Sequence, residues 1–216
     1  ASTEAYHNAM DDPEVTEPIF EATEKAGFLA VTWLDAGTRN FYTVGKAIHS
    51  PADLKGLKIR VQQSPTNIEM MKLLGGSAAP MGFGEVYTAL QSNIIDGAEN
   101  NEMALTDNGH GDVCKYYSYD MHQMVPDILI GNYAFIEELS DEEEDIFEKG
   151  YQIINQVQRQ EWIQAVQSAK TKAADEQRVQ FIYPDTKPFM EACMPLHQKV
   201  LAKNPDIHLS KSTSSH

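Results

Sequence analysis

The sequence predicts a protein of the α/β class, and three observations support that prediction. Apolar segments of strand length alternate with amphipathic helical segments along most of the chain. The 216 residues are 42% hydrophobic and 23% charged, which is an ordinary globular composition that can bury a substantial core. A helical pattern runs without proline from near Asp141 to about Gln180. A helix of about 40 residues would span roughly 60 Å, so it should bridge two bodies or carry a bend.

The first part of the chain is expected to hold one helix, three strands and a short helical turn. The helix over Thr16–Ala26 would have Pro18 in its first turn and Gly27 as its stop. A short helical turn is expected to begin at Ser50-Pro51-Ala52-Asp53, with Ser50 as its cap. The three strands are expected over Phe28–Leu34, Arg39–Val44 and Leu57–Val61.

The middle of the chain opens with a well-delimited helix. Ser64 is its expected cap, Pro65 its first helical residue and Gly75 its end. Later elements are expected as a strand over Ala78–Met81, a short helix over Gly84–Gln91, and extended segments over Tyr116–Val125 and Ile128–Phe135.

The long helix has a strong start signal. Ser140 and Glu143 form a capping-box pattern, and four successive acidic residues from Asp141 place negative charge at the positive end of the helix dipole. Its apolar residues fall close to one stripe: Ile146, Ile153, Ile154, Val157 and Trp162. A closing strand over Phe181–Pro184, a final amphipathic helix over Lys187–Lys203 and a tail are expected after it.

The charge balance excludes some classes of partner. Lys and Arg total 17 and Asp and Glu total 32, so the formal net charge is −15. Nucleic-acid and anionic-lipid surfaces both attract an excess of Lys and Arg, so neither partner is expected. No apolar run approaches the roughly 18 to 20 residues of a spanning helix. Ala1–Glu4 carries no signal-peptide pattern, so an exported form would be a processed one.

Motifs for cofactors, metals and catalysis are missing from the sequence. It contains no G-x-S-x-G, H-E-x-x-H, Walker or G-x-G-x-x-G pattern, so no cofactor and no enzyme activity are expected. Cys114 and Cys193 fit no zinc spacing and predict two buried thiols or one disulfide. Asp107, His110 and Asp112 are interpreted as loop residues in preference to a zinc or calcium site.

Four ordered segments resemble a known family. They are SPADLKGLKIRV at Ser50–Val61, LGG at Leu74–Gly76, PMGFGEVYTALQ at Pro80–Gln91 and IDGAEN at Ile95–Asn100. This set is similar to the solute-binding subunit of TRAP transporters, the tripartite ATP-independent periplasmic family. The resemblance implies a two-lobe periplasmic-binding-protein-like fold with a long bridging helix.

The resemblance also implies a division into lobes. Family members usually carry a longer front portion, so the first lobe should be incomplete. It would comprise residues 1–37 and 126–160, and the second lobe residues 38–125 and 161–205, with a tail over 206–216. Val31 and Trp33 would be under-covered, and the chain is expected to self-associate and to bind ligand weakly.

Six residues are implied as ligand contacts. Arg60 would hold the ligand carboxylate in a bidentate grip, Arg39 would reinforce it, and Phe83 would pack on the apolar face of the ligand. Asn100, Asn101 and His122 would supply amide and imidazole hydrogen bonds. Structural alternatives stay open at this stage: an interlobe salt bridge for Arg39, a core ring for Phe83, a turn for Asn100 and a satisfied structural histidine for His122.

The implied function is capture of a small organic acid outside the cytoplasm. The paired Asn100 and Asn101 favour a sugar acid such as a hexuronate. The expected partners are the carboxylate ligand and the membrane permease subunits of an ion-gradient-driven TRAP transporter. Two alternatives remain: a ligand-sensing module of the same fold, and an acid/base enzyme using Glu85, Asp96 and His122.

Overall fold

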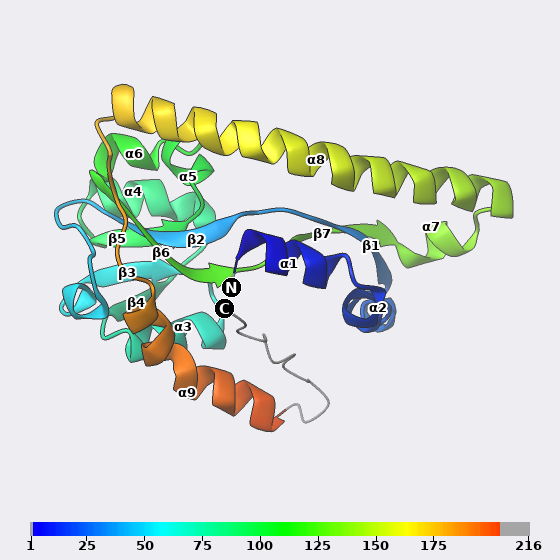
Figure 1. Ribbon diagram of the computed structural model, residues 1–216, viewed down its shortest axis with the longest axis horizontal. Coiled ribbons are helices and arrows are strands. Elements are labelled where there is room, and N and C mark those ends of the chain that lie inside the picture. The colour runs from blue at the N-terminus through cyan, green and yellow to red at the C-terminus, as the bar shows by residue number, and fades with distance from the viewer. Residues whose placement is uncertain (1, 204–216) are drawn as a thin grey trace, which may run out of the picture.

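The computed structural model describes residues 2–203 and arranges them as two bodies along one long helix (Figure 1). One body is built on a six-stranded sheet with the order β4-β3-β5-β2-β6-β8, and the other on the two-stranded sheet β1-β7. The strands are β1 (Phe28–Leu34), β2 (Thr38–Thr43), β3 (Lys58–Val61), β4 (Ser77–Pro80), β5 (Gly97–Asn100), β6 (Tyr116–Met124), β7 (Asp127–Asn132) and β8 (Gln180–Ile182). The predicted α/β class is confirmed.

The helices pack on both faces of the large sheet and in the small body. They are α1 (Thr3–Met10), α2 (Pro13–Glu21), α3 (Pro65–Leu73), α4 (Val86–Gln91), α5 (Met103–Thr106), α6 (His110–Val113), α7 (Tyr133–Glu137), α8 (Asp141–Asp175) and α9 (Lys187–Lys203). Short 3-10 turns η1 (Glu24–Ala26), η2 (Pro51–Leu54) and η3 (Phe83–Glu85) complete the described elements. Figure 1 shows α4, α5 and α6 between the large sheet and the C-terminal part of α8, with α3 and α9 on the opposite side.

Two predicted elements had wrong bounds. The helix expected over Thr16–Ala26 is α2 followed by the separate turn η1, because the Asp12 carboxylate caps α2 at the Glu14 N–H and Pro13 starts the helix. The extended segment expected to reach Phe135 ends at Asn132, whose side chain accepts a hydrogen bond from the Phe135 N–H and caps α7. A local cap outweighs the apolar pattern at both places.

Alternating side chains on β2 divide the core of the large body in two. Phe41 is buried toward α3 and α9, where it joins Ile59 and Phe189 in one cluster. Tyr42 is buried toward α4, α5 and α8, where it joins Tyr117 in the other cluster. Because successive strand residues point to opposite faces, β2 supplies a central residue to each cluster.

Helix α8 contacts both bodies, as predicted, although it ends at Asp175 and not near Gln180. Near its middle, Asn155 donates to the Trp33 carbonyl at 2.6 Å and Gln158 bonds the backbone of Asp35 in both directions. Near its C-terminus, Lys170 lies over the Tyr119 ring at 4.9 Å, beside the large sheet. Among residues 2–203, no helix combines the length and apolarity that crossing a membrane requires.

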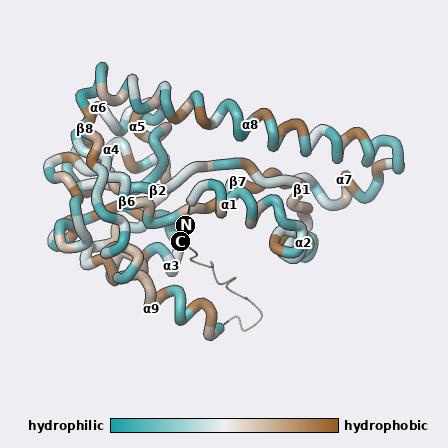
Figure 2. Tube along the Cα trace, viewed as in Figure 1, coloured by the Kyte–Doolittle hydropathy of each residue, from teal (hydrophilic) through white to brown (hydrophobic). Residues whose placement is uncertain are grey.

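The small body leaves apolar surface uncovered. Figure 2 shows hydrophobic positions along α8, and six of its large hydrophobic residues are exposed: Ile146, Phe147, Ile153, Ile154, Val157 and Ile163. Trp33 is an exception to the predicted under-covering. It is only 4% exposed, because Arg159 stacks over its indole at 4.9 Å and Tyr6 packs edge-on against it.

Gly97 occupies a position of the large sheet where a side chain would not fit. A Cβ there would lie 2.5 Å from the Tyr42 carbonyl oxygen, which is backbone and cannot move away. We expect Gly97→Ala to lower the free energy of unfolding by about 1 to 3 kcal/mol, measured by urea denaturation. Gly45→Ala is the matched control, because its Cβ would meet no atom within 4 Å. Equal stabilities of the two variants would contradict this reading of the strand contact.

Candidate cleft at the ends of the sheet strands

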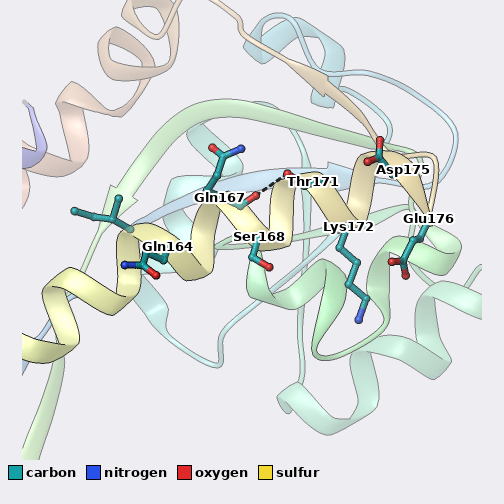
Figure 3. A pocket seen from close by; sticks show the side chains of 8 residues that line it. Gln164, Gln167, Ser168, Thr171, Lys172, Asp175 and Glu176 are labelled. Carbon is teal, nitrogen blue, oxygen red and sulfur yellow. Dashed lines mark hydrogen bonds between the residues drawn. The ribbon is translucent and has the colours of Figure 1, made fainter.

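A cleft of about 500 Å³ lies where β2 and β5 of the large sheet approach the start of β7. It gathers four of the six predicted ligand residues. They are Arg39, Phe83, Asn100 and Asn101. A wider hollow of about 740 Å³ runs along one side of α8, and none of the six predicted residues lines it (Figure 3). The cleft at the strand ends is therefore the candidate site.

Arg60 is buried in β3 beside the cleft wall and is held rigidly. Its Nε and Nη2 both donate to the Met81 carbonyl, at 3.1 and 3.0 Å, and its guanidinium lies 5.5 Å from the Phe83 ring centre. In the described part of the chain, Nη1 has no hydrogen-bond partner. Burial lowers the pKa of Arg60 below its usual value. The side chain is a pre-oriented cation adjoining the ring that lines the cleft.

Arg39 lines the cleft while one edge of its guanidinium is already engaged. Its Nε and Nη2 donate to the two carboxylate oxygens of Glu99, at 2.6 and 3.0 Å, and Nη2 also reaches the Glu99 carbonyl. Burial by itself raises the pKa of Glu99, but the facing His122 and Arg39 outweigh it and lower that pKa. Glu99 neutralises much of the charge of Arg39. Arg39 therefore contributes directed N–H donors to the cleft and little net positive charge.

His122 lies behind this pair and does not line the cleft. Its ring stacks on Phe41 at 4.3 Å, its Nδ1 bonds Asp120 at 2.7 Å, and its Nε2 lies 3.6 Å from Glu99. Burial by itself would lower the pKa of His122, but Asp120 and Glu99 raise it to about 9. The ring is therefore cationic at neutral pH and completes the chain Arg39–Glu99–His122–Asp120.

The two asparagines have different hydrogen-bonding roles. Asn100 accepts the Asn101 N–H through Oδ1, which leaves the Nδ2 donors for the cleft. Both ends of the Asn101 amide bond backbone groups. Its Nδ2 donates to the Ala36 carbonyl at 3.1 Å, and its Oδ1 accepts from the Met103 N–H. Asn100 thus presents donors, which suit a carboxylate, whereas Asn101 fastens β5 to the segment between β1 and β2.

Two residues of the alternative enzyme hypothesis, Glu85 and Asp96, bond backbone groups in separate places. Glu85 accepts the Gly82 N–H at 3.0 Å, and Asp96 accepts the Lys58 N–H at 2.7 Å. His122 is buried in the network described above. None of these three residues lines the cleft.

Of the three residues interpreted from the sequence as loop residues, Asp107 follows α5, but His110 and Asp112 lie in the short helix α6, so the loop interpretation was wrong for these two. His110 is buried with Nδ1 2.8 Å from the Tyr42 hydroxyl, and burial lowers its pKa to about 4. Cys114 and Cys193 are buried free thiols. Within residues 2–203, no group of three or more His, Cys, Asp or Glu side chains is placed to hold a metal ion.

Three polar residues that line the cleft were not predicted from the sequence: Gln62, Asn108 and Asp127. Gln62 follows Arg60 within the family-like segment, and Asp127 follows Pro126 at a predicted strand boundary. Neither position carries a local pattern that marks it as a cleft residue. Only the tertiary arrangement of β3, β7 and the loop before α6 brings them together.

The α/β fold with its long helix is shared with solved TRAP periplasmic solute-binding proteins. The chain matches bacterial extracellular solute-binding protein family 7 (DctP) over residues 1–204, and it belongs to that family. A solved TRAP periplasmic solute-binding protein from Anaerococcus prevotii, with bound α/β-D-glucuronate, is 66% identical with a TM-score of 0.92. The match covers 95% of this chain and 67% of that one.

More distant relatives share the fold. A TRAP periplasmic solute-binding protein from a Sulfitobacter species, with bound β-D-galacturonate, is 32% identical with a TM-score of 0.88, covering 95% of this chain and 68% of that one. The uncharacterized protein YiiZ of Salmonella typhimurium is 43% identical over 91% of this chain. The present chain spans 60% of the length of that relative.

The stability of the fold should depend on pH through His122. Because its pKa is raised from 6.5 to about 9, the folded state keeps a proton that the unfolded chain releases. This stabilisation is complete below about pH 6.5 and is lost as the pH rises through about 9. We expect the free energy of unfolding, measured by urea denaturation, to fall over this range, and the fall to be smaller in His122→Gln. The exposed His49→Gln is the control, and a His122→Gln profile parallel to wild type would count against the network.

Proposed function

We propose that this chain is the ligand-binding part of an extracytoplasmic solute-binding protein that captures a hexuronate. The observation that carries the proposal is the set of donors at one cleft: Arg39, the Nδ2 of Asn100 and the adjoining Arg60 under Phe83. A carboxylate is an acceptor-only group, so it matches N–H donors from two guanidinium groups and an amide. The D-glucuronate and β-D-galacturonate bound in the two similar solved structures support a sugar acid.

The individual roles follow from the hydrogen-bond inventory. Arg60 keeps Nη1 for the ligand carboxylate, Asn100 adds its amide donors, and Phe83 offers a ring face to the C–H surface of a sugar. Arg39 is held by Glu99 and reinforces the same end of the cleft. Asn101 and His122 act behind these groups by fixing β5 and the Arg39–Glu99 pair.

We propose the lobe boundaries at residues 1–37 and 126–160 for the first lobe and 38–125 and 161–205 for the second. The contacts of α8 support a division near residue 160. Gln158 and Arg159 bind the β1 side of the molecule, whereas Ala169 and Ala173 are buried against the large body. The tail over 206–216 lies outside the described residues.

Delivery of the ligand to the membrane permease of a TRAP-type, ion-gradient-driven transporter is the partner step of this proposal. Closure of the two lobes would exclude water and strengthen the arginine contacts. A ligand-sensing module of the same fold is the second candidate. Reconstitution with permease subunits separates the two, since only the transporter component supports uptake.

A thermal-shift screen tests the ligand class. D-glucuronate, D-galacturonate, N-acetylneuraminate and succinate would each be added to the protein over a concentration series. We expect the hexuronates to raise the melting temperature most, because a ligand that binds only the folded state stabilises it by mass action. No shift with any acid, or a larger shift with succinate, would overturn the hexuronate assignment.

Arg60→Lys should abolish most of the binding although it keeps the charge. The compact ammonium cannot reproduce the planar donor set that spans Met81 and the ligand, so we expect at least about a tenfold rise in Kd by calorimetry. Arg159→Lys is the matched control, because Arg159 also lies over an aromatic ring but is paired with Asp11, and neither residue lines the cleft. An unchanged Kd in folded Arg60→Lys would reject the role of Arg60.

We also propose that the chain self-associates through its small body. β1 and β7 pair only with each other within residues 2–203, and Ile146 and Ile153 are 64% and 60% exposed. Unpaired strand edges and exposed apolar surface both favour association. Light scattering should show a mass above 24.1 kDa that decreases in Ile146→Lys/Ile153→Lys but not in Ile94→Lys, an exposed isoleucine of the large body. A monomer at all concentrations would contradict this.

A further inference from the structure

Asp127 contributes a carboxylate to the cleft. It is the first residue of β7, and its backbone pairs with Leu34 at the end of β1. This register sets Asp127 beside the segment that carries Ala36, and both residues line the cleft. Within the described part of the chain, its carboxylate makes no hydrogen bond or ion pair with a protein group. After burial and Asp35, the charge of Asp127 contributes to raising the pKa of the Tyr6 hydroxyl. An unengaged acceptor therefore belongs to the cleft from the side of the small sheet.

The cleft has a positive charge beside its wall, on Arg60, and a negative charge in its lining, on Asp127. Arg39 is compensated by Glu99 at 2.6 Å, so this pair adds little net charge. Arg60 adjoins Phe83 and is a cation without a carboxylate partner in the described chain. Asp127 is the uncompensated anion on the small-sheet side. The cleft thus combines one cationic and one anionic group for a single ligand.

We propose that Asp127 determines specificity by accepting a ligand hydroxyl and rejecting a second carboxylate. The inference rests on the proposed function and narrows it to hydroxylated monocarboxylates, such as hexuronates, in preference to dicarboxylates of the same carbon skeleton. A hydroxyl donates to the Asp127 carboxylate, whereas a ligand carboxylate at that place meets a like charge and no donor.

The proposed specificity can be tested with two ligands that differ at one end of the carbon chain. D-glucuronate and D-glucarate share a carboxylate and a row of hydroxyls, but D-glucarate replaces the hemiacetal end with a second carboxylate. Repulsion between unit charges in a partly desolvated cleft is stronger than in bulk water. The net charge of −15 also disfavours a dianion, but this effect acts from the whole surface and not from one residue. A control must therefore separate the local charge from the global one.

The experiment is calorimetric titration of D-glucuronate and D-glucarate into wild type, Asp127→Asn and Asp145→Asn. Asp127→Asn is nearly isosteric at an exposed position, so it tests charge with little change in packing. Asp145→Asn removes the same charge from an exposed site on α8, where Asp145 lies 3.6 Å from Lys149. The ring-opening difference between the ligands enters the ratio of the two Kd values equally in every protein, so it cancels when the ratio of a variant is compared with that of wild type.

We expect wild type to prefer D-glucuronate, and Asp127→Asn to shift the Kd ratio toward D-glucarate by about tenfold, or about 1.4 kcal/mol. Asp145→Asn should leave each Kd value, and therefore their ratio, within about twofold of wild type, because solvent and salt screen the charge of an exposed side chain. If D-glucuronate binds but Asp127→Asn leaves the ratio unchanged, or if Asp145→Asn shifts it as much, the inference on Asp127 fails while the proposed function stands. If wild type binds neither acid, the proposed function fails first.

Discussion

The buried ion pair between Arg39 and Glu99 is the interaction on which the cleft depends. It joins β2 to β5, and His122 and Asp120 extend it to β6. Each charge is taken out of water, so each must have a partner, and loss of one partner typically costs about 3 to 5 kcal/mol. The alternating charges of this chain hold three neighbouring strands in one register at the point where they reach the cleft.

This arrangement explains why the wall of the cleft is rich in donors. Glu99 occupies one edge of the Arg39 guanidinium, the Met81 carbonyl occupies one edge of Arg60, and the Asn101 N–H occupies the Asn100 oxygen. In each case, a hydrogen bond to one part of the side chain holds the side chain in place, and its remaining nitrogen donors make no such bond within the described part of the chain. Side chains held in this way lose little freedom when a ligand binds, which is the advantage of a pre-organised site.

Helix α8 links the two bodies through chemically different contacts. Toward the small body it uses side-chain amides on backbone groups, with Gln158 bonding both the N–H and the carbonyl of Asp35. Toward the large body it buries small residues, Ala169 and Ala173, and places Lys170 over aromatic rings. The first set is directional and the second is a packed surface, so the C-terminal part of α8 is built into the core of the large body.

The sequence alone determined the class of fold, most of the elements and the family, because these depend on local patterns. Apolar alternation defined Phe28–Leu34, and the capping box at Ser140 defined the start of α8. The family-like segments from Ser50 to Asn100 pointed to Arg60, Phe83 and Asn100. Where prediction failed, as at Thr16–Ala26, a single local cap decided the boundary.

The tertiary structure decided what each polar group has left to offer. No sequence pattern shows that Asn101 bonds Ala36, or that His122 lies behind Glu99 with a pKa of about 9. Asp127 reaches the cleft only because β7 pairs with β1 in one register. These outcomes depend on contacts between residues distant in the chain, on burial and on competition for hydrogen-bond partners. A residue type therefore predicts which chemistry is possible, and the fold determines which part of it remains free.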